Sequence, residues 1–234
     1  MKIDTKQFRE HYEELLGLIP KNLSKKLCVF FPQVGKNYYN MEEKILFIGK
    51  SVNSWITNKL NMDILFDSKN EERIVNRDDE IYWVERNDNK HYNSNNSAFW
   101  RLIRNITKKY ILKNDWYNNI SWTNLFKISP WAGGNPSGYL QKLQSKICIN
   151  ILNKEIEYLN PKIIVFLTSY WETFYLKSIG LDLNKNKTVK WDKYETYYQI
   201  FNNRIYILSH HPQGKKEELH VNAILKAINN CKNK

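Results

Sequence analysis

Four short segments of the sequence place hydroxyl, amide, imidazole and indole groups directly after apolar runs. They are Gly49-Lys50-Ser51-Val52-Asn53-Ser54-Trp55, Thr123-Asn124, Thr168-Ser169-Tyr170-Trp171 and His210-His211-Pro212-Gln213-Gly214. Amide and imidazole groups can hydrogen-bond the edge of a planar heterocycle, and aromatic rings can stack on its face. The residue types therefore favour a binding site for a flat heterocyclic ligand.

The runs before these segments predict four buried strands, at residues 44–49, 120–128, 162–167 and 204–208. Predicted helices alternate with them. They cover residues 5–17 after an Asp4 cap, a segment capped by Ser97, a long segment capped by Ser137, a segment starting near Ser169, and residues 215–230. The alternation predicts a three-layer α/β/α fold with a central, mostly parallel four-stranded sheet. Ligands of such sheets bind beyond the carboxyl ends of the strands, where all four segments should meet.

The remaining segments predict little regular structure. A second short helix is expected after Asn22, and residues 60–95 form a polar excursion with a short helix or hairpin near 81–84. Residues 185–201 are expected to add a hairpin. With no repeat or low-complexity linker, we predict a single domain over 1–234, with N-terminal helices in 1–43 and a core over 44–230.

Composition narrows the class of protein. The 234 residues are 42% hydrophobic and 14% aromatic, which supports a folded core, and no run approaches the roughly 20 apolar residues of a membrane span. The charged N-terminus is unlike a secretion signal, so we expect a cytoplasmic protein. A net charge of +12 favours nucleic acid as a partner over a merely lysine-rich composition. The widely spaced Cys28, Cys148 and Cys231 predict neither a disulfide framework nor a sequence-local metal site.

Five motifs in order resemble the uracil-DNA glycosylase superfamily, and its mismatch-specific and single-strand-selective branches more than the iron–sulfur branches. The quoted segments are FIGKSVNSW, Asn96-Ser97-Ala98-Phe99-Trp100, WTNLFKISP with Asn124, the strand Pro161–Leu167, and Ser209-His210-His211-Pro212-Gln213. They resemble the family's first loop, its N-R-F-W helix opening, its Asn-bearing strand, its P-K-x-I-V-x-L strand and its H-P-S motif. The similarity covers most of residues 44–228.

The resemblance implies a uracil-DNA glycosylase-like fold and hydrolysis of the N-glycosidic bond of uracil or a related damaged base in DNA. The target nucleotide would leave the stack and enter a pocket. His211, followed by Pro212, would hydrogen-bond a base oxygen and stabilise its developing charge. Asn124 would read a pyrimidine edge. Ser51 or Asn53 would position water in the first loop, and Gly49 and Trp55 would help to bind the base.

The first loop departs from the family pattern. Ser51 and Val52 stand at the family's Asp or Asn and Pro positions, and no carboxylate is present to act as a base. The protein could therefore instead be a non-catalytic relative that binds a nucleobase, nucleotide or uracil-containing DNA. A third alternative is an enzyme of another class that uses the same four strand-end segments. Adjacent His210 and His211 should point to opposite faces, so we expect no metal site there. We also expect no cofactor, and we expect the protein to be a monomer.

Overall fold

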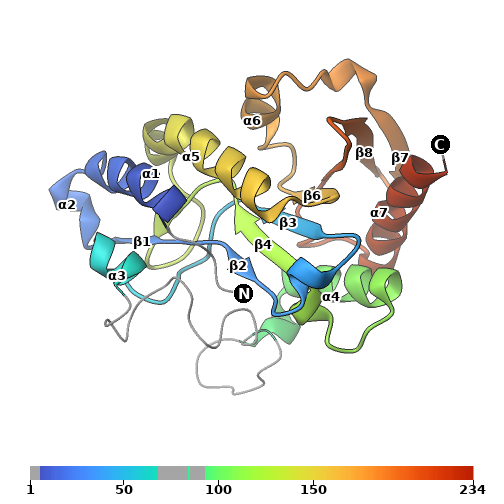
Figure 1. The fold of residues 1–234 in the computed structure, drawn as a ribbon, viewed down its shortest axis with the longest axis horizontal. Coiled ribbons are helices and arrows are strands. Elements are labelled where there is room, and N and C mark those ends of the chain that lie inside the picture. Colours follow the sequence, from blue (N-terminus) through green and yellow to red (C-terminus); the bar gives the residue numbers. More distant parts are fainter. Residues whose placement is uncertain (1–5, 68–83, 85–92, 234) are drawn as a thin grey trace. The chain divides into compact units, whose positions relative to one another are not determined.

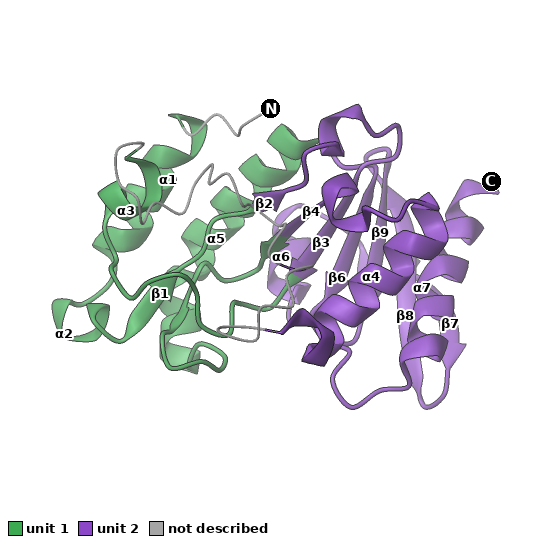
Figure 2. Ribbon diagram, turned by 90° about the horizontal axis from the view of Figure 1, so that it is seen from below, with its two compact units in different colours: residues 1–32, 49–78, 123–160 green, residues 33–48, 79–122, 161–234 purple. Residues whose placement is uncertain are grey.

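The computed structural model describes residues 6–67, 84 and 93–233. The chain forms two compact units that are interleaved along the sequence, shown in green and purple in Figure 2. Unit 1 comprises residues 1–32, 49–78 and 123–160, and unit 2 comprises residues 33–48, 79–122 and 161–234. The single domain predicted over 1–234 stays a prediction.

Unit 2 contains a seven-stranded sheet in the order β2-β4-β3-β6-β9-β8-β7. The bounds are Gln33–Val34 (β2), Ile45–Gly49 (β3), Ile120–Asn124 (β4), Ile163–Leu167 (β6), Lys187–Trp191 (β7), Tyr194–Phe201 (β8) and Arg204–Ser209 (β9). β3, β4, β6 and β9 are the four predicted strands, and β3, β4 and β6 are buried along their whole length. The predicted α/β class with a mostly parallel central sheet is confirmed.

Strands outside the predicted four widen the sheet. β3, β6 and β9 pair in parallel, whereas β2 pairs with β4, and β8 with β9, in antiparallel orientation. β7 and β8 form the hairpin expected within 185–201. Asn202 and Asn203, both at positive φ, make the tight turn from β8 to β9, as a two-residue hairpin requires. β2 was not predicted because a two-residue strand has no measurable alternation.

Helices lie on both faces of this sheet. Tyr198 of β8 accepts a hydrogen bond from Asn230 of α7 (Glu217–Lys232), and Ile207 is its register partner on β9. On β6, Val165 is in register with Ile207, so the next residue, Phe166, points to the other face of the sheet. Phe166 packs against Tyr175 of α6 (Thr173–Ser178), with ring centroids 6.1 Å apart. Because successive side chains of a strand point to opposite faces, α7 and α6 cover opposite sides (Figure 1).

Unit 1 is built mainly from helices and a small second sheet. Its helices are α1 (Lys6–Gly17), α2 (Lys21–Ser24), α3 (Met62–Phe66) and α5 (Gly138–Leu159). α1 packs along α5, with Phe8 and Tyr158 in edge-to-face contact at 5.9 Å. The sheet pairs β1 (Leu27–Val29) with β5 (Ile128–Pro130) in antiparallel orientation. The fully buried side chain of Gln144 on α5 bonds both the N–H and the C=O of Ile128, at 2.9 Å each, and so satisfies the backbone of β5.

The predicted helix caps are correct where they can be compared. Ser97 Oγ accepts from the N–H of Trp100 at the start of α4 (Ala98–Ile111), and Ser137 Oγ accepts from Leu140 at the start of α5. Asn61 caps α3 in the same way, a helix that sequence periodicity missed because it is only five residues long. Asp4 and most of the segment near 81–84 lie outside the described residues.

Two predicted boundaries were wrong. The strand expected over 120–128 is two strands, β4 and β5, which belong to different sheets. Lys127, between them, directs its side chain into a buried ion pair. The helix expected near Ser169 begins at Thr173, since Ser169 and Tyr170 both adopt positive φ and form a turn.

Candidate functional site

In unit 1, the first loop lies beside the end of the Asn124 strand. The N–H of Leu125 donates to the carbonyl of Gly49 at 2.9 Å, and the N–H of Phe126 donates to Lys50 at 3.0 Å. These bonds continue the contact between the two chain segments one residue past Gly49 and two residues past Asn124. Ser51 and Asn124, predicted as site residues from distant parts of the sequence, therefore stand at one edge of the unit.

Ser51 and Asn124 each present a buried polar atom without a partner among the described residues. Ser51 Oγ and Asn124 Nδ2 are both shielded from water, and Asn124 as a residue is only 1% exposed. Leaving a buried amide or hydroxyl unpaired costs about 1–3 kcal/mol, so such groups in a native protein call for an explanation. A ligand that accepts and donates hydrogen bonds at this edge would supply one.

The side chain of Asn53, which the sequence suggested for positioning water, bonds to a neighbouring loop. Its Oδ1 accepts a hydrogen bond from the N–H of Gly134 at 2.6 Å, and it lies only 2.8 Å from where a Cβ on Gly133 would stand. Gly133 and Gly134 both have positive φ, which favours glycine at each, and at Gly133 the close approach of Asn53 is a second reason. The amide oxygen of Asn53 thus joins the first loop to the Gly-Gly-Asn-Pro loop. Trp55 packs edge-to-face on Phe30, with centroids 5.2 Å apart.

A fully buried ion pair underlies Asn124. Lys127 Nζ donates to Glu155 Oε2 (2.8 Å), to Thr123 Oγ1 (2.8 Å) and to the carbonyl oxygen of Asn124 (2.7 Å), and both charged side chains are 0% exposed. All three ammonium protons therefore have acceptors. Thr123 also donates to Glu155 Oε2 at 2.8 Å. Burial raises the pKa of Glu155, and the Lys127 ammonium opposes that rise. Sequence reasoning missed this pair because a lysine in a strand-end loop is ordinarily exposed.

In unit 2, three separate segments meet at His211. Its backbone N–H donates to Ser169 Oγ at 2.9 Å, and its ring stacks on Phe99 of α4, with centroids 6.2 Å and planes 17° apart. The N–H of Gln213 donates to His211 Nδ1 at 3.4 Å. A neutral ring with Nδ1 accepting carries its proton on Nε2, so this histidine presents a hydrogen-bond donor there. Pro212, next to it, is buried.

His210 is held by aromatic rings. Tyr170 and Tyr194 lie 4.8 and 4.9 Å from its ring. Tyr170 Oη donates its single proton to the carbonyl of Glu195 (2.9 Å), so its 3.0 Å contact with His210 requires the histidine to donate from Nε2. Burial, and then the Lys215 ammonium, lower the pKa of His210 below its ordinary 6.5. The adjacent histidines therefore have different surroundings, as the alternation of a strand predicts.

A buried chain of polar groups lies beneath these histidines. Trp191 Nε1 donates to Thr196 Oγ1 (3.0 Å), which contacts Ser209 Oγ (2.8 Å), which in turn contacts Nε2 of His220 on α7 (2.8 Å). The Trp191 and His220 rings stack at 4.3 Å. Burial, followed by the charges of His210, Lys215 and His211, lowers the pKa of His220 to about 3. The sequence shows His220 only as one member of an apolar helical stripe, so it was not singled out.

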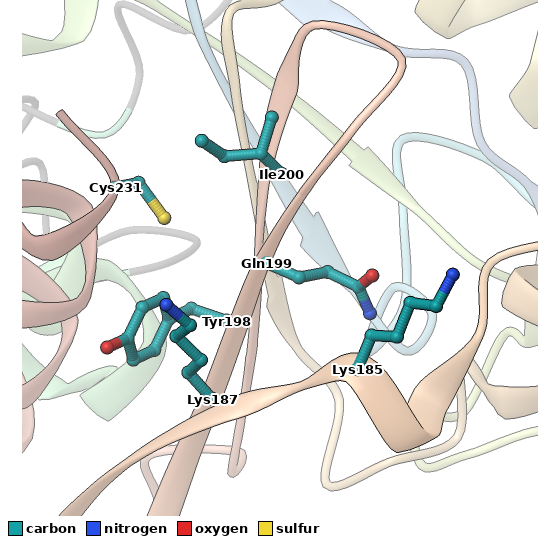
Figure 3. A pocket seen from close by; sticks show the side chains of 6 residues that line it. All are labelled: Lys185, Lys187, Tyr198, Gln199, Ile200 and Cys231. Carbon is teal, nitrogen blue, oxygen red and sulfur yellow. The ribbon is translucent and has the colours of Figure 1, made fainter. Parts of the chain in front are cut away.

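A hollow of about 220 Å³ in unit 2 does not contain the predicted site residues. Lys185, Lys187, Tyr198, Gln199, Ile200 and Cys231 line it. Figure 3 shows that Tyr198 and Gln199 project to opposite sides of their strand, so the polar groups do not converge on one ligand. Among the described residues, no group of three or more His, Cys, Asp or Glu is placed to hold a metal ion. No helix there is long and apolar enough to cross a bilayer.

The structure thus gathers the predicted residues in two groups. Gly49, Ser51, Asn53, Trp55 and Asn124 belong to unit 1, and His211 and Pro212 belong to unit 2. Within each group, segments distant in sequence lie side by side. That both groups line a single cavity stays a prediction.

These features define an α/β protein whose polar loops follow the ends of buried strands. The family model of the uracil DNA glycosylase superfamily matches residues 56–226, which is well over half of the chain, and the chain therefore belongs to this superfamily. The predicted family is confirmed, whereas the predicted branch stays a prediction. No curated protein matches the chain. The matched range includes Asn124, His211 and Pro212, and it begins directly after Trp55, so it leaves out the divergent first loop.

The buried ion pair generates a stability prediction. Lys127→Met leaves the Glu155 carboxylate buried without its cation, which we expect to lower the free energy of unfolding by about 3–5 kcal/mol in urea denaturation. Lys127→Met combined with Glu155→Leu should recover most of this loss. Lys154→Met is the matched control, because Lys154 and Glu157 are 2.9 Å apart, close to the 2.8 Å of the buried pair, but exposed; its effect should stay within about 1 kcal/mol. Equal losses in the two single variants would contradict the account.

His220 generates a prediction about pH. Below its ordinary pKa of 6.5, the unfolded chain binds a proton that the folded protein takes up only near pH 3. The free energy of unfolding should therefore fall as the pH falls from 6.5, with a limiting slope of about 1.4 kcal/mol per pH unit for this one group. Urea unfolding of wild type, His220→Gln and the exposed control Asn229→Gln at several pH values measures it. A slope unchanged in His220→Gln would show that His220 is not the group responsible.

Proposed function

We propose that this protein is a DNA glycosylase that hydrolyses the N-glycosidic bond of uracil or a related damaged base. The observation that carries the proposal is the Asn124 carboxamide, which is buried at the end of β4 with Nδ2 lacking a partner among the described residues. A carboxamide offers one donor and one acceptor, which matches the carbonyl and N–H of the uracil edge. Membership of the superfamily supports the same reaction class.

His211 would act on the departing base. Its backbone N–H is held by Ser169, and the ring itself is oriented by two contacts, the stack on Phe99 and the bond from Gln213 to Nδ1. A hydrogen bond from Nε2 to a base oxygen would strengthen as negative charge develops in the transition state. Ser51 is the first-loop group proposed to position the attacking water. Asn53 is proposed to hold the loop through Gly134, with its Nδ2 directed to the same task.

The protein is proposed to work in the cytoplasm as a monomer and without a cofactor. Cys28, Cys148 and Cys231 are free and buried, which suits a reducing compartment. Burial raises the pKa of the Cys148 thiol to about 12, so this residue is an inert part of the core rather than a nucleophile.

The excision assay tests the glycosylase proposal. The protein is incubated with uracil- or hypoxanthine-containing single and double strands, and abasic sites are then cleaved with alkali. We expect cleavage at one of these bases, with His211→Ala and Asn124→Ala each lowering the rate by about 10²–10³-fold at near-wild-type stability. Asn229→Gln should leave the rate unchanged. No cleavage of any substrate by folded wild-type protein would overturn the proposal.

A second function is favoured by one feature of the first loop. No carboxylate occurs in 49–55, and Asn53 Oδ1 is engaged by Gly134. A protein that binds the base without cutting the bond would need no water-positioning group. Titration calorimetry with uracil, uridine nucleotides and uracil-containing single strands should then show binding that Asn124→Ala removes, together with an inactive excision assay. No heat with any of these ligands at low salt would end this alternative.

A further inference from the structure

Two lysines from different elements converge on one tyrosine ring in unit 2. Lys193, in the turn between β7 and β8, places Nζ 5.7 Å from the centroid of Tyr194. Lys215, in the loop after β9, places Nζ 4.8 Å from the same centroid. Cation–π attraction holds ammonium groups at such distances from an aromatic ring. The ring thus concentrates two positive charges from two loops. We call Lys193, Tyr194 and Lys215 the lysine–tyrosine cluster.

No carboxylate within the described ranges 6–67 and 93–233 forms an ion pair with the lysine–tyrosine cluster. Asp192 pairs with Lys216 at 3.8 Å, Glu195 accepts from Tyr197 Oη, and Glu217 is held by Arg101 at 2.9 Å. Among the described residues, neither Lys193 nor Lys215 forms an ion pair, and Lys215 donates only to the carbonyl of Gln213 at 3.3 Å. Two uncompensated ammonium groups attract a polyanion more strongly than paired surface lysines do.

The positive charge of Lys215 in the cluster affects the pKa values of nearby histidines. After burial, Lys215 is the next cause that lowers the pKa of His210, and it also lowers the pKa of His220. The Tyr194 ring lies 4.9 Å from the ring of His210, one residue before His211. Lys215 follows His211 by four residues, across a turn in which Gly214 has a φ of +72°. The positive potential is therefore located beside the histidine proposed to act on the base.

We propose that the lysine–tyrosine cluster binds two phosphates of the DNA strand that carries the target base. This inference rests on the proposed function, because it takes DNA as the partner, and it assigns binding to residues outside the proposed base site. Lys193 and Lys215 act as point charges that each neutralise one phosphate, and Tyr194 keeps them close together before binding. Contacts to phosphate carry no base information, so the cluster strengthens binding to all sequences alike.

Salt dependence of DNA binding tests this role. Each neutralised phosphate contributes a slope of about 0.7 to the plot of log affinity against log salt for a single strand, and about 0.9 for a duplex. A fluorescently labelled thymine-containing strand without uracil avoids cleavage during the measurement. By fluorescence anisotropy over a series of KCl concentrations, Lys193→Gln/Lys215→Gln should reduce the slope by about 1.4 on the single strand or about 1.8 on the duplex.

Lys185→Gln/Lys187→Gln is the matched control. It also removes two positive charges, but at the first residue of β7 and just before it, roughly 13 Å of extended strand away from the turn. Its effect on the slope should be less than half that of the cluster variant. Tyr194→Phe keeps the ring and should bind like wild type, whereas Tyr194→Leu should weaken binding, because the two ammonium groups are then no longer held together.

The outcomes separate this inference from the proposed function. Equal slopes in the cluster and control variants would overturn the phosphate role, and so would the absence of DNA binding by wild type at low salt. Excision of uracil, measured separately, decides the glycosylase proposal. A protein that excises uracil yet shows equal slopes leaves the function standing and removes the inference. If the cluster variant shows the predicted slope change but the protein never excises the base, the phosphate role stands and the glycosylase proposal falls.

Discussion

The buried pair of Lys127 and Glu155 is the interaction on which unit 1 depends. Transfer of a charge from water into a protein interior costs several kcal/mol, and close contact with hydrogen bonds to the charged groups offsets part of this cost. The Lys127 ammonium has acceptors for all three protons, including the backbone carbonyl of Asn124. The same contacts join the segment between β4 and β5 to Glu155 of α5. The backbone of Asn124, which carries the carboxamide, is therefore held by one of the charged groups of this ion pair.

Unit 2 orders its histidines by hydrogen bonding. His220 is buried and neutral beneath β9, His210 is enclosed by tyrosines, and His211 is oriented by Ser169, Phe99 and Gln213. Burial, and then positive charge nearby, lowers the pKa of His210 and of His220, which favours the neutral form of both rings. Neutral histidine with a proton on Nε2 is a hydrogen-bond donor that needs no proton uptake before it can act. Such a donor suits stabilisation of a departing anionic base.

Membership of the superfamily and the divergence of the first loop are compatible. The family match begins after Trp55, and the loop before it replaces the expected water-positioning residues with Ser51 and Val52. Val52 is a core residue at 3% exposure, and Asn53 holds the neighbouring glycine loop. The loop lies beside Asn124, and its side chains differ from those that the resemblance implies. Folds tolerate such change because chemistry resides in a few loop residues, whereas the sheet depends on continuous apolar strands.

The sequence by itself determined the elements whose causes are local. Runs such as Ile163–Leu167 predict buried strands, Ser97 and Ser137 predict helix starts, and the order of motifs predicted the superfamily. Only the tertiary structure decided the pairing of Lys127 with Glu155, the bond from Gly134 to Asn53, and the stack of Trp191 on His220. These contacts join residues 28, 81 and 29 positions apart. Residue type and spacing describe neighbours along the chain, but burial and the partners of a charged group depend on which distant segments pack together.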